Sequence, residues 1–182
     1  MPLPEPSPRR HMHTRQIQCA GFKRDDDLWD IEATLTDTKT YGFENHDRGE
    51  IEAGEPVHLM HLRVTLDLDL VIQEIVSASD YTPFRLCKKA EKAMQSLVGL
   101  QIGSGWLKEA RKRVPFSVSC THLFELLGPV ATTAYQTMHW AIEEREKQNP
   151  DRQPLPILDT CISLGRHTAV VKAEWPEFYQ PK

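Results

Sequence analysis

The spacing of hydrophobic residues changes partway along the chain, and this change constrains the fold more than any other feature. From Trp29 to Leu35 every second residue is apolar, which is the period of a half-buried β-strand. Beyond Pro83, apolar residues recur three and four positions apart, as they do on one face of a helix. Strands that precede helices, rather than alternate with them, favour an α+β fold over a wound parallel sheet.

Three segments of the first half have the pattern of strands. They cover residues 15–22, 29–36 and 57–66, and the polar, glycine-containing segment 40–55 between the last two is predicted to be a loop. The alternation in the third strand places five side chains on one face, namely His58, Met60, Leu62, Val64 and Leu66.

A hairpin is predicted to follow the third strand. Residues 67–69 form the turn, and residues 70–78 return as its partner, with Ile72 and Val76 on a shared face. Strands that pair with their neighbours in chain order make an antiparallel meander sheet.

Helices are predicted after this sheet. Residues 84–98 form an amphipathic helix that ends before Gly99, and a short helix covers 105–113. We expect these helices to build a layer of their own.

One long helix is predicted to complete this layer. It begins near residues 119–121, where hydroxyl side chains suit the N-cap, and Gly128-Pro129 should kink it. A last strand is expected over 167–172. The predicted fold is therefore α+β, an antiparallel meander sheet followed by a helical layer with one long kinked helix.

The length of 182 residues suits one domain. Residues 1–13 hold four prolines and few apolar side chains, so they are predicted to be a disordered arm. Residues 14–182 are predicted to form a single α+β domain. Within it, the three prolines of residues 150–156 indicate a connecting segment.

Charge and hydropathy exclude several classes of protein. The net charge is −4, with 22 basic residues scattered among 26 acidic ones, which argues against a nucleic-acid partner. No apolar run reaches the ~18 residues of a membrane span, and no secretory signal is recognisable at the start. We therefore expect a cytoplasmic protein without a membrane partner, whose four cysteines stay reduced.

Four short motifs occur in order along the chain: LWDIE at 28–32, LTDTK at 35–39, GEPVH at 54–58 and CTHL at 120–123. In this combination the chain resembles an uncharacterised bacterial family that is catalogued only as a domain of unknown function. The resemblance extends over nearly the whole sequence. It implies membership of that family and no particular activity.

A second resemblance concerns layout. A Gly-Glu-Pro turn at 54–56, a hairpin, a helix with Cys87 and a later helix that opens with Cys120 are similar to the NifU/IscU-type scaffolds of iron–sulfur cluster assembly. The similarity covers roughly residues 54–142. It departs from that pattern because His58 stands where the first ligand cysteine would be, and because Cys87 lies inside its helix. What the resemblance implies is three ligands that converge at one end of a scaffold-like sheet.

The candidate metal ligands are His58, Cys87, Cys120 and His122. Thiolate and imidazole ligands together suit zinc or iron, and three protein ligands leave one coordination position open for water or substrate. Cys120 and His122 are two residues apart, so on a regular helix they would face different sides. Both can reach one ion only if the chain at the start of the helix departs from helical geometry.

Other roles for these residues stay open. Cys120 could be the nucleophile of an enzyme, with His58 or His122 as its base, because a helix N-terminus stabilises a thiolate. The domain could equally be a non-catalytic module that binds a small-molecule ligand or forms a homodimer. Buried cysteines and histidines are also ordinary core residues, so the sequence leaves open whether the protein is an enzyme.

Overall fold

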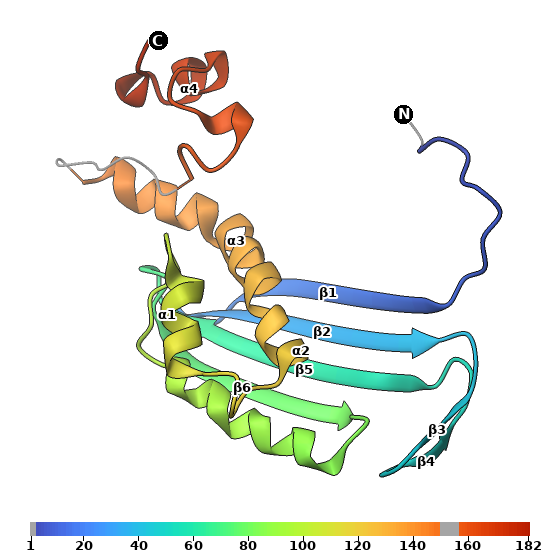
Figure 1. The fold of residues 1–182 in the computed structure, drawn as a ribbon. Coiled ribbons are helices and arrows are strands. Elements are labelled where there is room, and N and C mark those ends of the chain that lie inside the picture. The colour runs from blue at the N-terminus through green and yellow to red at the C-terminus, as the bar shows by residue number, and fades with distance from the viewer. Residues whose placement is uncertain (1–2, 150–156) are drawn as a thin grey trace. The chain divides into compact units, whose positions relative to one another are not determined.

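We describe residues 3–149 and 157–182 of a computed structural model of the chain. The main sheet has four antiparallel strands in the order β1-β2-β5-β6 (Figure 1). These strands are β1 (His13–Lys23), β2 (Trp29–Lys39), β5 (Pro56–Leu66) and β6 (Ile72–Tyr81). Each strand pairs with its neighbour in an antiparallel register. The predicted antiparallel sheet and α+β class are confirmed.

A small hairpin interrupts the meander between β2 and β5. It consists of β3 (Phe43–Asn45) and β4 (Gly49–Ile51), which pair only with each other. The prediction of a loop over 40–55 is therefore wrong for these two segments. The reason is that strands of three residues are too short to show an alternating pattern in the sequence.

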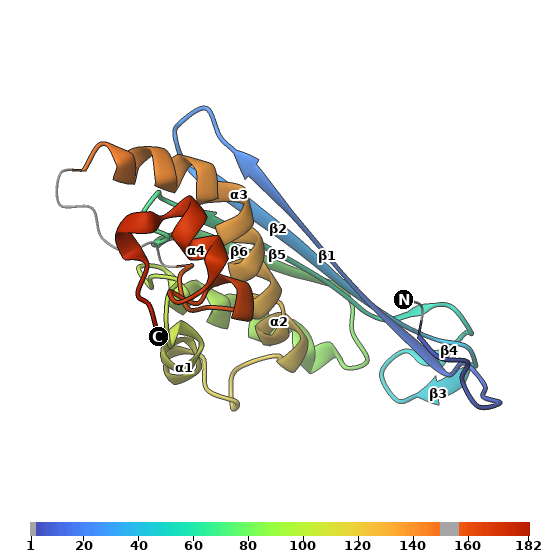
Figure 2. The same ribbon diagram turned by 90° about the horizontal axis from the view of Figure 1, so that it is seen from above.

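The helices of the first 137 residues lie on one face of the sheet (Figure 2). They are η1 (Arg85–Leu97), a 3-10 helix, followed by α1 (Trp106–Arg113), α2 (Thr121–Glu125) and the first half of α3 (Leu127–Lys147). Inward-facing residues of β2 and β5 meet these helices in a core that includes Ile31, Leu35, Met60, Leu62, Leu123 and Leu127. Each fully buried aliphatic side chain of this kind contributes about 1.5–3 kcal/mol.

The long helix is kinked, as predicted. Proline at position 129 has no amide hydrogen for the carbonyl of Glu125, and α2 ends at Glu125 while α3 begins at Leu127. The N-cap prediction was wrong in detail: the N-cap of α2 is Cys120, and no side chain caps it.

A bulge in β6 between Ile72 and Glu74 overturns the prediction that Ile72 and Val76 share a face. The register of β6 against β5 shifts between Thr65 and Leu66, and again between Leu59 and Met60. An extra residue at each shift turns the following side chains to the other face. As a result Ile72 and Ile75 are buried, whereas Val76 is 43% exposed.

The described residues form two compact units, 1–137 and 138–182. The second has its own small core of Leu158, Val171 and Trp175. It contains η2 (Ile162–Leu164), α4 (Ala169–Glu174) and η3 (Pro176–Phe178). The strand predicted over 167–172 is therefore wrong: Thr168 accepts a hydrogen bond from the amide of Val171 and so caps a helix there.

The predicted arm over residues 1–13 and the single domain over 14–182 stay predictions. Residues 4–12 carry neither helix nor strand, and the regular structure begins with β1. The proline-containing connection at 150–156 lies outside the described residues. In the described part of the chain, every helix is too short or too polar to cross a membrane.

A glycine in β1 permits close packing of α3 against the sheet. A Cβ added at Gly21 would lie 1.9 Å from Oγ1 of Thr137, which is far inside van der Waals contact. We therefore expect Gly21→Ala to lower the free energy of unfolding by about 1–3 kcal/mol, as overpacking does. Urea unfolding measures the change, and Gly103→Ala, where no atom lies within 4 Å of the added Cβ, is the matched control.

The same substitution in a Thr137→Ala background separates this contact from other effects. Thr137→Ala removes the contacts at 1.9 and 2.6 Å and leaves the Cβ of residue 137 at 2.7 Å from the added methyl group, so Gly21→Ala should then cost less than it does in the wild type. An equal loss in both backgrounds would show that the close contact is not the cause.

Candidate functional site

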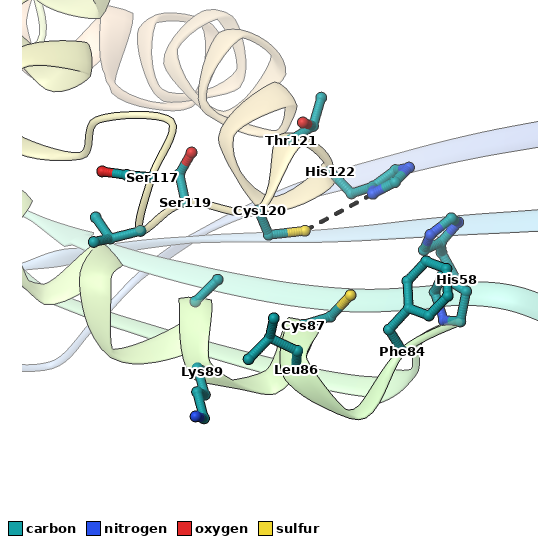
Figure 3. Close-up of a pocket in the computed structure, with 13 residues that line it drawn as sticks. His58, Phe84, Leu86, Cys87, Lys89, Ser117, Ser119, Cys120, Thr121 and His122 are labelled. Carbon is teal, nitrogen blue, oxygen red and sulfur yellow. Dashed lines mark hydrogen bonds between the residues drawn. The ribbon is translucent and has the colours of Figure 1, made fainter. Parts of the chain in front are cut away.

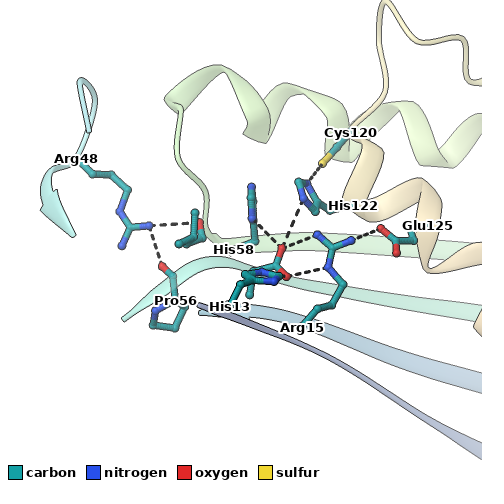
Figure 4. Close-up of polar contacts among 10 residues, drawn as sticks. His13, Arg15, Arg48, Pro56, His58, Cys120, His122 and Glu125 are labelled. Carbon is teal, nitrogen blue, oxygen red and sulfur yellow. Dashed lines mark hydrogen bonds and ion pairs between the residues drawn. The ribbon is translucent and has the colours of Figure 1, made fainter. Parts of the chain in front are cut away.

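A buried carboxylate lies at the centre of the candidate site. Asp37 continues the inward-facing series of β2 that Ile31, Ala33 and Leu35 begin, and it is 2% exposed. An ionised carboxylate in an apolar layer is stable only when charges and hydrogen bonds replace its water. The neighbouring strands and α2 supply these partners (Figure 4).

Arg15 on β1 is the principal partner of this carboxylate. It lies opposite Asp37 in the register of the two strands, and its Nε and Nη2 donate to the two carboxylate oxygens at 2.8 and 2.7 Å. Its remaining nitrogen, Nη1, donates to Glu125 of α2. Burial alone would raise the pKa of Asp37, but Arg15 outweighs it and holds the pKa below the usual value.

Three histidines surround the same carboxylate. His58 lies opposite Asp37 in the register of β5, and its Nδ1 is 3.0 Å from Oδ2 of Asp37. His122 of α2 places Nε2 3.6 Å from the same oxygen. The more exposed His13 places Nε2 3.1 Å from Oδ1. Thus two imidazoles from different elements meet at one carboxylate oxygen.

The imidazoles of His58 and His122 also contact each other. Their ring centroids are 3.7 Å apart and the rings are inclined by 30°. Burial and, to a smaller extent, the neighbouring His122 together lower the pKa of His58 to about 4. Burial and Arg15 likewise lower the pKa of His122. Both rings are therefore neutral near pH 7, which is the form that binds metal ions.

The regular register of β2 and β5 places His58 opposite Asp37, and an irregularity follows directly after this pair. The pairing runs without a break from Trp29 and Leu66 to Asp37 and His58, and the register then shifts so that Thr38 pairs with Pro56. Bulges of this kind redirect a strand next to functional sites. The β3–β4 hairpin supports the bulge, since Arg48 donates from Nη1 to the carbonyl oxygen of Pro56 at 2.9 Å (Figure 4).

The same hairpin holds the start of η1. The carboxylate of Asp47 accepts a hydrogen bond from the amide of Arg85 at 2.8 Å. One short hairpin therefore positions both β5, which carries His58, and η1, which carries Cys87.

A pocket of about 760 Å³ adjoins the histidines (Figure 3). All four residues predicted from the sequence line it: His58 from β5, Cys87 from η1, and Cys120 and His122 from the start of α2. The backbone of Cys120 is extended, with φ −96° and ψ 129°, and this places its Sγ 3.8 Å from Nδ1 of His122. The chain thus departs from helical geometry at the position where the sequence analysis required it.

The described residues bring together one group of three metal-ligating side chains, and it differs from the predicted set. Ligand atoms of Asp37, His58 and His122 all lie within 4.8 Å of one another. Cys87 and Cys120 lie outside this group, and burial raises the pKa of the Cys87 thiol. Metal ligation by the two cysteines stays a prediction.

Sequence reasoning missed four members of the cluster: His13, Arg15, Asp37 and Glu125. For Asp37 a signal was present. It falls two residues after Leu35, at an inward position of the alternating pattern, and a charged residue on a buried face needs partners. No sequence pattern marks the other three, because their roles depend on which strand and helix lie beside β2.

We expect the stability of the metal-free protein to depend on His58 below pH 7. Its pKa is about 4 in the folded state against an ordinary value of 6.5, so the unfolded chain takes up the proton first. The contribution is fully present above about pH 6.5 and is lost as the pH falls, reaching a loss of about 3 kcal/mol near pH 4.

Urea unfolding in the presence of EDTA, for the wild type and His58→Gln, measures this dependence. The variant lacks the titrating ring, so its stability should fall less between these pH values. The lowered pKa of Asp37 acts only at lower pH and is common to both proteins. Parallel curves for the two proteins would contradict the assignment.

Comparison with known proteins places the chain in a family. A family model described as protein of unknown function (DUF2889) matches residues 13–136, a range that contains the whole sheet and every residue of the cluster. No curated protein and no solved structure shows significant similarity to the chain. The resemblance of layout to NifU/IscU-type scaffolds stays a prediction. The match spans more than half of the sequence, so the protein belongs to the DUF2889 family of proteins of unknown function.

Proposed function

We propose that Asp37, His58 and His122 bind a divalent zinc or iron ion. The observation that carries this proposal is the spacing around one carboxylate oxygen: Nδ1 of His58 is 3.0 Å and Nε2 of His122 is 3.6 Å from Oδ2 of Asp37. Ligands about 2.0–2.1 Å from a tetrahedral ion lie about 3.3 Å apart. Each nitrogen is therefore at nearly this separation from the carboxylate oxygen, and ligand atoms of all three residues lie within 4.8 Å of one another.

The donor set supports the choice of metal. Two imidazoles and one carboxylate are the ligands of many catalytic zinc sites and of non-haem iron sites. A neutral His58 donates from Nδ1 to Asp37. When Nδ1 binds the ion, the proton would move to Nε2, so binding needs a change of tautomer and no release of a proton from this ring.

The charges around the ligands also support a cation. With the two buried imidazoles neutral, Arg15 contributes one positive charge, and Asp37 and Glu125 contribute two negative ones. The excess negative charge favours a divalent ion. Arg15 holds the carboxylate in a fixed orientation through two hydrogen bonds, which is the role that outer partners have in metal sites.

Three protein ligands leave at least one coordination position open. His58 and His122 line the pocket, so that position would face a space large enough for a small molecule. A metal ion there would act as a Lewis acid on water or on a bound substrate.

Metal content and affinity test this proposal. We expect protein purified without a histidine tag to hold about one zinc or iron ion per chain and, after chelation, to bind zinc in calorimetry. His122→Gln should weaken zinc binding at least about tenfold. His61→Gln is the matched control, because His61 also contacts a carboxylate, that of Asp80, at 3.1 Å but lies outside the cluster.

Cys120→Ser distinguishes the cluster from the set predicted in the sequence analysis. The variant should bind zinc as the wild type does, and cobalt-substituted protein should lack a thiolate charge-transfer band. Loss of affinity in Cys120→Ser would assign the thiolate as a ligand. Metal well below one equivalent, or affinity unchanged in His122→Gln, would refute the proposal.

One observation favours a second function, that of a cysteine-dependent enzyme. Sγ of Cys120 is 3.8 Å from Nδ1 of His122, whose Nε2 is 3.6 Å from Oδ2 of Asp37. Nucleophile, base and orienting carboxylate follow one another in this order in cysteine hydrolases, often with longer contacts before substrate binds.

Alkylation by iodoacetamide, followed by peptide mass spectrometry, tests this second function. Cys161 is exposed and serves as an internal reference. If His122 activates Cys120, the pocket thiol should react faster than Cys161 at pH 7, and His122→Gln should abolish the difference. Slower reaction of Cys120 than of Cys161 would exclude this function.

A further inference from the structure

The pocket has features that identify the chemical class of its ligand. We propose that it binds an organic anion with an apolar body, whose acid group lies at the His58–His122 end and whose apolar part lies along η1. This inference rests on the proposed metal site, because the ion supplies the positive charge at that end. It adds the substrate class, which the metal site alone does not specify.

The size of the pocket suits a small organic molecule. Its volume of about 760 Å³ lies within the ~300–1,000 Å³ of pockets that enclose drug-sized ligands. An acid group alone would fill only a small part of it. The remaining space extends from the histidines along Cys87 and Cys120 toward Leu86 (Figure 3).

The walls of this remaining space are mostly apolar. Phe84 and Leu86 line it from the start of η1 and Val118 from the opposite loop, and these side chains are 51%, 68% and 51% exposed. When an apolar ligand covers apolar side chains that are exposed together around a pocket, the burial of their surface favours binding.

The charges of the lining determine the sign of the ligand. Among the described residues, no aspartate or glutamate lines the pocket, whereas Lys89 does. A cationic ligand would therefore lose its hydration without gaining a counter-charge. A sugar-like ligand would leave most of its hydroxyl groups facing apolar side chains.

The histidine end supplies the positive charge. Without metal, Arg15, Asp37 and Glu125 leave one negative charge in excess. A divalent ion on Asp37, His58 and His122 would reverse the sign, and three protein ligands would leave it a coordination position for the acid group. A carboxylate oxygen is a good ligand for that position. The ligand is thus oriented with its acid group on the ion.

Calorimetric titration with three molecules of equal chain length tests the inference: octanoate, octanol and octylamine. We expect zinc-loaded wild type to bind octanoate at least about tenfold more tightly than octanol, and octylamine not measurably. The reason is that only the anion gains from the ion. Chelation of zinc should remove the preference for octanoate over octanol.

Two variants locate the binding site. Leu86→Asp places a carboxylate in the pocket at a position that is 68% exposed, so the fold should tolerate it, and octanoate affinity should fall at least about tenfold. Leu107→Asp on α1 makes the same change at an exposed position outside the pocket and should leave octanoate affinity unchanged. Both variants should bind zinc as the wild type does.

The outcomes separate this inference from the proposed function. If zinc binds but octanoate binds no better than octanol, or if Leu86→Asp has no effect, the ligand class is wrong and the metal site stands. If zinc does not bind in a direct titration, the proposed function fails, and the orientation of the ligand fails with it.

Discussion

The carboxylate of Asp37 is removed from water on the inward face of the sheet, and the arrangement of the site follows from how that charge is stabilised. An unpaired buried carboxylate costs several kcal/mol, so its partners must come from whichever elements lie next to β2. Arg15 comes from β1, His58 from β5 and His122 from α2. One side chain thus joins three neighbouring elements, and each of them is held in the position where its residue reaches Asp37.

The ion pair of Arg15 and Asp37 also determines the chemistry that the histidines can carry out. Burial and the positive charge of Arg15 keep His58 and His122 neutral, so their nitrogen lone pairs remain available near pH 7. A neutral imidazole next to a fixed carboxylate can bind a metal ion, and it can equally accept a proton from a thiol such as that of Cys120. The pocket beside them lies between η1 and the start of α2, which are the elements that carry the two cysteines.

Much of the fold follows from local patterns in the sequence. The alternation of Trp29 to Leu35 predicted β2, and the proline at 129 predicted the kink in the long helix. The β6 bulges escaped prediction because a bulge depends on the partner strand rather than on residues such as Ile72 and Val76 themselves.

Part of the candidate site was also predicted from the sequence. His58, Cys87, Cys120 and His122 were identified from residue type and order, and they line one pocket. Asp37 was not identified, because its role appears only when the register sets it opposite both Arg15 and His58. Pairing across strands is a property of the folded sheet, and the sequence shows only which residues face inward.

The most direct test of the metal site is an anomalous difference map from crystals grown with zinc. If Asp37, His58 and His122 bind the ion, the map will contain one peak per chain, about 2.0–2.2 Å from Oδ2 of Asp37, Nδ1 of His58 and Nε2 of His122. Arg15 should still contact the carboxylate in that map. A peak on the sulfur atoms of Cys87 and Cys120, or no peak between Asp37 and the two histidines, would contradict the proposed metal site.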